Sequence, residues 1–444
     1  MSGLHELGSR RNDTLAQSRK PLSRVTAGAL ALILLLLSTL PCPAYSVLTH
    51  EQIVDFVWER HIKRLLLERF PNATQDDLQH AHAYAYGGCL IQDMGYYPAG
   101  NKFFSDLLHY VRSGDFVREL INQAQDVNEL AFALGALAHY ASDNRGHPAV
   151  NASVALMFPK LRKKYGDEVV YAEDPTAHIR TEFGFDVLQV AKQRYSSDVY
   201  HDFIGFEVAQ PLLERAFLNI YGLELKDIFS NEDRTLGSYR RAVSKLIPKL
   251  TQVALVVKKD ELKALPNFEP RRFRYLLSRT QYEKEWGNNY YRPGFGSRFL
   301  AFLVRLLPKV GRLRALDIKT PTPQTEKLYV KSVEDTVIFY DMLLTEYETR
   351  QLETPNRDYD TGNPTSPGEY TLADKAYAKF LQKLAQKNFA QASPALKANI
   401  LEYYSDLSRP LETKKHKHEW QETLRNLELL KAHGSTPASG QQSP

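Results

Sequence analysis

The chain has 444 residues and a formal net charge of +5, and this length suggests two or three domains, or one large domain with extensions. Hydrophobic residues make up 43% of the chain and charged residues 25%, which is ordinary for a globular protein. The basic excess is too small to indicate a nucleic-acid-binding protein by itself.

Residues 1–44 have the features of a secretory signal sequence. A basic stretch ends at Arg24, and "AGALALILLLLSTL" follows it as an apolar core of roughly 14 residues, which is short for a membrane span. Small side chains at Cys42 and Ala44 then suit cleavage after Ala44, which would make Tyr45 the new N-terminus. The sequence therefore predicts an exported protein, periplasmic or secreted. Because the basic region is long, an uncleaved membrane anchor is the alternative.

The chain has only two cysteines, Cys42 and Cys89. Cleavage of the signal would remove Cys42, so the mature protein would have one thiol and no internal disulfide. An exported protein of this size can be stabilised by its core or by bound metal ions instead.

Helical periodicity covers nearly all of residues 45–262. The stretch "QDDLQHAHAYAYGGCLIQDMG" predicts a helix that ends near Gly95 and has Asp93 in its last turn. The stretch "DVNELAFALGALAHYASD" is nearly all small and apolar, so we expect its helix in the middle of a bundle. We expect that helix to end before His147, which precedes a proline. No alternating run is long enough to require a sheet, and we predict an all-α bundle of roughly seven or more helices.

A domain boundary is expected at "ALPNFEPRR", residues 264–272. Residues 263–432 are predicted to form a mainly helical C-terminal region with a loop at 353–370, and residues 433–444 a polar, disordered tail.

Two features of this C-terminal region have alternative interpretations. Residues 297–316 predict basic amphipathic helices, which either lie on an anionic membrane or, as we favour, cover the bundle. Asp358, Asp360 and Glu369 occupy positions 1, 3 and 12 of a calcium-loop count, but position 6 is Asn363 instead of glycine and two prolines interrupt the loop, so calcium is disfavoured.

Pairs of metal-ligand side chains recur on the predicted helices. His139 and Asp143 are four residues apart, as are His178 and Glu182, so each pair shares one helix face. A single such pair is more often a contact on a helix surface. Their recurrence on apolar helices favours a metal site, because an unpaired charge would be costly there.

In its order of ligand-type residues the chain resembles the zinc-dependent phospholipase C family, whose superfamily includes fungal single-strand-specific nucleases. It also resembles the N-terminal domain of glycosylphosphatidylinositol-specific phospholipase D. The resemblance covers residue 45 to about residue 250. It rests on the ligand order and on the segments "LTHEQIVD", "AHAYAYGGCLIQDMGYYP", "FFSDLLHYVRSGDF" and "FALGALAHYASDN".

This resemblance implies three zinc ions in an all-helical fold. The first ion would be held by Asp93, His109, His139 and Asp143. The second would be held by His147, His178 and Glu182. The third would be held by His50, by Asp143 as a bridge, and by the amine and carbonyl of Tyr45, where the family typically has tryptophan. Signal cleavage would therefore be a chemical requirement.

The spacer between Asp143 and His147 departs from the bacterial phospholipases and the nucleases. It is Asn144–Arg145–Gly146, whereas those enzymes have a longer gap with a Gln-Pro pair. The shorter spacer is closer to the glycosylphosphatidylinositol-specific branch, and it puts any transfer of substrate preference in doubt.

The implied activity is that of an exported zinc-dependent phosphodiesterase of the phospholipase C type, acting on a phospholipid headgroup, with peripheral membrane contact as a further expectation. Clustered zinc ions lower the pKa of a bound water and neutralise charge on phosphoryl oxygens. Asp93 is the candidate to orient or deprotonate that water, and its alternative role is that of a plain zinc ligand.

Two other functions are weighed against this one. A single-strand nuclease or 3'-nucleotidase-like enzyme would need a basic groove with aromatic stacking platforms, and the near-neutral charge argues against it, so no nucleic acid is expected as a partner. A non-catalytic, zinc-stabilised protein that binds a membrane or a partner is disfavoured because the whole ligand set is present. Tyrosines near the ligands either line a substrate cleft or, as we favour, pack in the core: Tyr84, Tyr86, Tyr96, Tyr97 and Tyr140.

Overall fold

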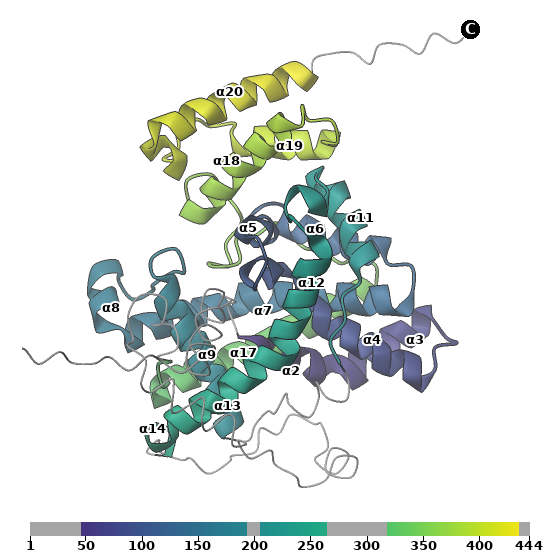
Figure 1. Ribbon diagram of the computed structural model, residues 1–444, viewed down its shortest axis with the longest axis vertical. Helices are drawn as coiled ribbons and strands as arrows, with labels where there is room; N and C mark the ends of the chain where they lie inside the picture. Colours follow the sequence, from purple (N-terminus) through teal and green to yellow (C-terminus); the bar gives the residue numbers. More distant parts are fainter. Residues whose placement is uncertain (1–45, 193–204, 264–317, 435–444) are drawn as a thin grey trace, which may run out of the picture. The chain divides into compact units, whose positions relative to one another are not determined.

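A computed structural model of the chain describes residues 46–192, 205–263 and 318–434 (Figure 1). The predicted signal sequence, Tyr45, the basic amphipathic segment 297–316 and all but the first residues of the expected tail lie outside these ranges.

The described residues form helices and no β-strand, which confirms the prediction of an all-α fold. The α-helices of the first part are α2 (Val47–Val57), α3 (Lys63–Arg69), α4 (Gln75–Gly88), α5 (Lys102–Tyr110), α6 (Ser113–Gln123), α7 (Val127–Met157), α8 (Pro159–Tyr165), α9 (Pro175–Ala191), α11 (Gln210–Tyr221), α12 (Glu232–Arg241), α13 (Ile247–Val257) and α14 (Lys259–Lys263). Those of the C-terminal part are α17 (Pro323–Glu348), α18 (Thr371–Gln386), α19 (Pro394–Tyr403) and α20 (Lys417–Gly434). None of these helices combines the length and the apolar character that crossing a bilayer requires.

Helix α7 is the central element of the bundle. Its 31 residues include a long run of buried small and apolar side chains, and α4 and α17 pack against it (Figure 1). The backbones of α4 and α7 approach so closely that a Cβ atom at Gly135 would lie 2.1 Å from the carbonyl oxygen of Ala85. The expected central position of this segment is therefore observed, and its small residues are what permits the close approach.

Helix α7 does not end before His147, as the sequence predicted, but continues through Pro148 to Met157. A proline within a helix removes one N–H donor, here the donor that would bond the Asn144 carbonyl. The loop residue Gly362 lies against that carbonyl, at a position where a Cβ atom would be 2.7 Å from its oxygen. Tertiary packing thus accommodates the proline, and His147 stays on the same helix as His139 and Asp143.

Asp93 does not lie on α4, which is a second correction. Helix α4 ends at Gly88, and Asp93 belongs to a separate 3-10 helix, Ile91–Tyr96. Two adjacent glycines weaken the end of α4 because glycine is a poor helix former. Gly88 also lies close to α7, where a Cβ atom would be 1.9 Å from the Phe132 carbonyl oxygen. The chain turns there, so Asp93 approaches α7 from a different direction.

The C-terminal helices share one hydrophobic core with the first part of the chain. Tyr340 of α17 is fully buried, and its hydroxyl donates a hydrogen bond to the carbonyl of Leu134 on α7 at 2.8 Å. Helix α18 packs against α5. The predicted loop 353–370 connects α17 to α18, and several of its side chains are buried, among them Tyr359 and Asp360.

Candidate metal centre

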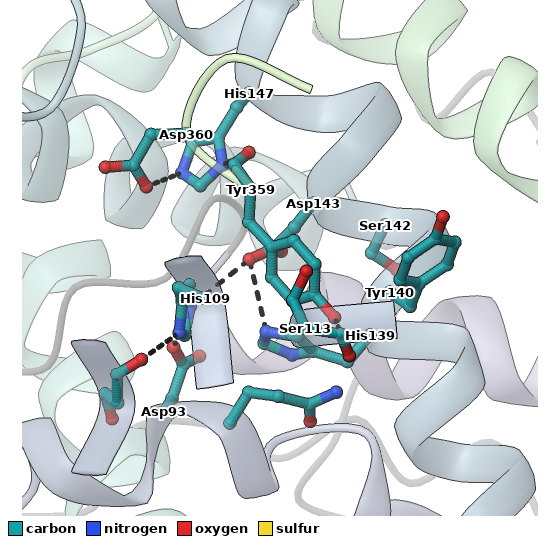
Figure 2. Close-up of polar contacts among 12 residues, drawn as sticks. Asp93, His109, Ser113, His139, Tyr140, Ser142, Asp143, His147, Tyr359 and Asp360 are labelled. Atoms are coloured by element: carbon teal, nitrogen blue, oxygen red, sulfur yellow. Dashed lines mark hydrogen bonds and ion pairs between the residues drawn. The ribbon is translucent and has the colours of Figure 1, made fainter. Parts of the chain in front are cut away.

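Imidazole and carboxylate groups from three helical segments meet beside α7 (Figure 2). His139 Nε2 lies 3.1 Å from Asp143 Oδ2, and both residues point from the same face of α7. His109, in the last turn of α5, places its Nε2 3.3 Å from Asp93 Oδ1 and 3.5 Å from Asp143 Oδ2. The structure therefore brings together the four residues of the first predicted zinc site.

His50 of α2 reaches the same carboxylate from the other side. Its Nε2 lies 3.5 Å from Asp143 Oδ1, and its ring stacks on that of His139 with the centroids 4.6 Å apart. Asp143 thus directs Oδ1 toward His50 and Oδ2 toward His109 and His139. This division of the two oxygens is what a carboxylate that bridges two cations requires.

Backbone carbonyls fix how three of the imidazoles are turned. The Nδ1 atoms of His109, His139 and His147 lie 2.8, 3.0 and 2.6 Å from the carbonyl oxygens of Ser105, Cys89 and Tyr359, respectively. A carbonyl oxygen can only accept, so each Nδ1 carries the proton and each Nε2 of the neutral ring has a lone pair. Because ligating histidines are commonly held in this way, the arrangement fits metal binding through Nε2.

The carboxylates of the cluster are buried and have no well-formed hydrogen bond. Asp93 and Asp143 are fully buried, and among the described residues the polar groups near their side-chain oxygens are imidazole nitrogens at 3.1–3.5 Å. Buried anions of this kind are costly unless a cation neutralises them. Ligand atoms of His50, His139 and Asp143 lie within 4.8 Å of one another, as do those of Asp93, His109 and His139. This set of nitrogen and oxygen donors fits zinc.

The pKa values of His109, Asp93 and Asp143 are shifted both by burial and by the charges of their neighbours in the cluster. Burial lowers the pKa of His109, but the adjacent carboxylates of Asp143 and Asp93 outweigh burial and raise that pKa to about 10. Burial raises the pKa of Asp93. Burial would also raise the pKa of Asp143, but His139 and His109 hold it well below its usual range. Without a metal ion, protonated imidazole is therefore the counter-charge of these carboxylates.

The second predicted group lies between α7 and α9 and is less closely gathered than the first, because the ligand atoms of His147, His178 and Glu182 do not all lie within 4.8 Å of one another. His178 Nδ1 is 3.3 Å from Glu182 Oε1, and the rings of His147 and His178 have centroids 6.5 Å apart. His178 Nε2 lies 2.6 Å from the carbonyl oxygen of Val169, so this ring carries its proton on Nε2 and offers Nδ1. Burial raises the pKa of Glu182 well above its usual range. His178 therefore faces the buried Glu182 carboxylate with Nδ1, whereas His109, His139 and His147 have Nε2 available.

Two residues of the loop 353–370 belong to this centre although the ligand pattern did not include them. Tyr359 packs its ring 5.2 Å from the ring of His109, and Asp360 Oδ1 lies 3.7 Å from His147 Nε2 (Figure 2). They lie far along the chain from the predicted ligands. The sequence signal in this loop was the calcium-loop spacing; of its residues, Asp358 and Asp360 are buried and Glu369 is exposed.

The tyrosines near the ligands mostly pack in the core, as the sequence analysis favoured. Tyr86, Tyr97 and Tyr140 are buried, and the Tyr86 hydroxyl donates to Asp55 Oδ1 at 2.7 Å. Tyr84 and Tyr96 are half-buried, and the ring of Tyr96 meets the edge of His109 with centroids 5.8 Å apart. Tyr96 is thus the tyrosine of this set that combines partial exposure with a contact to the cluster.

Comparison with known families identifies the segment that holds the cluster. Residues 49–231 match the family described as zinc dependent phospholipase C. This range contains each predicted ligand that the structure describes, from His50 to Glu182, and it ends before the loop 353–370. Neither a curated protein nor a solved structure matches the chain.

Proposed function

Because residues 49–231 belong to the zinc-dependent phospholipase C family, we propose that this protein is a zinc-dependent hydrolase of phospholipid headgroup phosphodiesters. The observation that carries the proposal is the position of Asp143, whose two oxygens face separate imidazole groups at 3.1 to 3.5 Å. A buried carboxylate shared in this way suits a cluster of cations better than a single structural ion.

The proposed cluster has three zinc ions. Asp93, His109, His139 and Asp143 would hold the first, and His147, His178 and Glu182 the second. The third would be held by His50, by Asp143, and by the amine and carbonyl of Tyr45 after signal cleavage, which makes export part of the proposal. Tyr45 lies outside the described residues.

The start of α2 supports a functional N-terminus at this place. Asp186 of α9 accepts hydrogen bonds from the Leu48 backbone N–H at 3.0 Å and from the Thr49 hydroxyl at 2.7 Å. Ser46 and Leu48 are buried, and His50 reaches Asp143 two residues later. Asp186 therefore anchors the residues that directly follow the predicted cleavage site beside the cluster.

Zinc, when bound, supplies Lewis-acid polarisation of a phosphoryl oxygen and lowers the pKa of a water molecule. The residues of the chain position the ligand groups and orient the imidazole rings. Asp143 holds the ligand groups at a fixed separation, and the hydrogen bonds to Ser105 and Cys89 orient His109 and His139. Asp93, a fully buried carboxylate of the cluster, would orient the attacking water or accept a proton from it.

The test uses the mature chain from residue 45, purified and analysed for zinc by elemental mass spectrometry. It is then assayed on phosphatidylcholine vesicles and on single-stranded DNA, with His418→Ala as a control because His418 is exposed and lies outside the cluster. We expect hydrolysis of the phospholipid and more than one zinc ion per chain. Cleavage of DNA alone would replace the lipid substrate by a nucleic acid, and one zinc ion or none would rule out the cluster.

A further inference from the structure

The loop 353–370 is fixed to the helices that carry the ligands. The Tyr359 backbone N–H donates to the carbonyl of His109 at 3.2 Å, and the Thr354 hydroxyl donates to the carbonyl of Gly114 at 2.8 Å. Arg357 donates its backbone N–H to the Ser113 hydroxyl at 3.0 Å. The loop therefore has a defined position over α5 and the start of α6.

Helix α7 holds the backbone of the same loop at two consecutive residues. His147 Nδ1 donates to the carbonyl of Tyr359 at 2.6 Å, and Asn151 Nδ2, one helical turn later, donates to the carbonyl of Asp360 at 3.0 Å. These two contacts set the direction in which the Asp360 side chain leaves the backbone. They place it against the Nε2 side of the His147 ring (Figure 2).

The two oxygens of Asp360 have different surroundings. Oδ2 accepts hydrogen bonds from the hydroxyls of Tyr110, at 2.8 Å, and of Tyr370. Oδ1 lies 3.7 Å from His147 Nε2, which is too long for a hydrogen bond. Two atoms that bind one tetrahedral zinc ion lie roughly 3.3–3.6 Å apart, because each is about 2.0–2.2 Å from the metal. The separation of Oδ1 and Nε2 is close to that of two ligands of one ion.

We propose that Asp360 Oδ1 is the fourth ligand of the zinc ion that His147, His178 and Glu182 hold. The inference rests on the proposed zinc centre, and it adds a residue from outside the family-matched segment. In the described residues, no three ligand atoms of His147, His178, Glu182 and Asp360 lie within 4.8 Å of one another, so binding of the ion would draw these side chains together.

The balance of charge supports a fourth, anionic ligand. Two neutral imidazoles and the Glu182 carboxylate would leave one positive charge on a zinc site that is almost completely buried. The Asp360 carboxylate neutralises it, and burial of a neutral assembly costs less than burial of a net charge. The hydroxyls of Tyr110 and Tyr370 orient the carboxylate through its other oxygen, as outer-shell partners of ligands commonly do.

Four protein ligands leave no open position on a tetrahedral zinc ion. Substrate can therefore bind to this ion only if Asp360 leaves it or if the ion becomes five-coordinate. The same bond would tie the loop to the cluster. Removal of the metal should loosen the loop, and loss of the carboxylate should weaken the metal site.

The experiment compares Asp360→Asn with Asp358→Asn in the mature chain. Asp358 is a matched control because it is buried in the same loop, and Asn keeps the oxygen that accepts from the backbone N–H of Asp360. After dialysis against a weak chelator, zinc is counted by elemental mass spectrometry. We expect Asp358→Asn to match the wild type and Asp360→Asn to lack about one ion per chain. Equal zinc in Asp360→Asn and the wild type would overturn the assignment without affecting the proposed function, whereas a zinc-free wild type would overturn both.

A second measurement needs no variant. Hydrogen–deuterium exchange is followed in the wild type, with and without a strong chelator, at residues 356–362 and at the turn 387–393 between α18 and α19. We expect chelation to speed exchange in the loop at least several-fold and to leave the distant turn unchanged. Unchanged protection of the loop after complete removal of zinc would also overturn the proposal.

Discussion

The Nδ1 atom of His147 lies 2.6 Å from the carbonyl oxygen of Tyr359, although 212 residues separate the two along the chain. Because that oxygen can only accept, it holds the proton on Nδ1 and leaves Nε2 of the neutral ring as the donor to a metal ion. A loop outside the family-matched segment thus sets which ring nitrogen of a neutral histidine inside it carries the proton. The C-terminal region is in this sense part of the candidate metal centre.

Replacement of His178 by alanine should remove metal from the second group. Its Nδ1 faces Glu182 at 3.3 Å, and the buried Glu182 carboxylate would be left with one imidazole fewer beside it. We expect His178→Ala to lose about one zinc ion per chain, as counted by elemental mass spectrometry. The exposed His418→Ala variant should keep the zinc content of the wild type. A full complement of zinc in His178→Ala would contradict the ligand assignment.

Replacement of Asp93 by asparagine should separate catalysis from metal binding. Asparagine keeps the size of the side chain and one oxygen, but it cannot accept a proton from water as a carboxylate does. His109, His139 and Asp143 remain, so at least part of the zinc should stay bound. We expect kcat to fall by about 100-fold or more while zinc content falls less than in His178→Ala. Full activity in Asp93→Asn would show that its assigned role is wrong.

Gly362 should be sensitive to alanine because of its contact with α7. Its φ is +73°, and a Cβ atom would lie 2.7 Å from the Asn144 carbonyl oxygen beside Pro148. Gly205 is the control, since its φ is +88° and the nearest atom to an added Cβ would be the Cβ of Ala83 at 3.8 Å, an ordinary contact. Both variants carry the strain of a positive φ, and only Gly362→Ala adds the clash.

The two glycine variants are compared by urea unfolding. We expect Gly362→Ala to lower the free energy of unfolding by roughly 1–2 kcal/mol more than Gly205→Ala does. Equal losses in both variants would mean that the loop moves away from α7 without cost.

Asp186 should make stability depend on pH. Burial raises its pKa to about 6, above the ordinary value of 3.8, although hydrogen bonds from Thr49, Ser46 and Leu48 act in the opposite direction. The folded state therefore binds the proton more tightly than the unfolded state. The stabilisation from this group is complete below about pH 3.8 and is lost as the pH rises through about 6.

Urea unfolding with a chelator present, at pH 4 and pH 7, measures this effect for Asp186→Asn and for the wild type. The asparagine variant cannot titrate here, so relative to it the wild type should gain roughly 2–3 kcal/mol between pH 7 and pH 4. Asp167→Asn is the control, because the Asp167 side chain is 81% exposed. If the wild type and Asp186→Asn respond identically to pH, the raised pKa is not a property of this carboxyl group.

Local periodicity in the sequence was enough to predict the helices and the ligand pairs within them. His139 and Asp143, and likewise His178 and Glu182, come together because residues four apart share a helix face in any α-helix. The all-α class follows from the same signal. The order of ligand-type residues, read as a set, was enough to indicate the family that matches residues 49–231.

Element boundaries were less predictable. The expected helix end before His147 and the expected helix through Asp93 were both wrong. Proline usually ends or kinks a helix, but α7 continues through Pro148, where Gly362 lies against the Asn144 carbonyl that lost its hydrogen-bond donor. At Gly88, α4 lies close to α7 and ends. The hydrophobic periodicity had predicted that this helix continues to Gly95.

The sequence by itself determined the helical class, the family that residues 49–231 match and the side chains available for a metal centre, because these depend on residue type and on short, regular spacings. Only the tertiary structure decided which oxygen of Asp143 faces which imidazole, which nitrogen each histidine offers, and that Tyr359 and Asp360 join the centre. The physical reason is that these features arise from contacts between segments far apart in the chain. Asp360 meets His147 only because the folded loop is held against α7 by hydrogen bonds that no local pattern encodes.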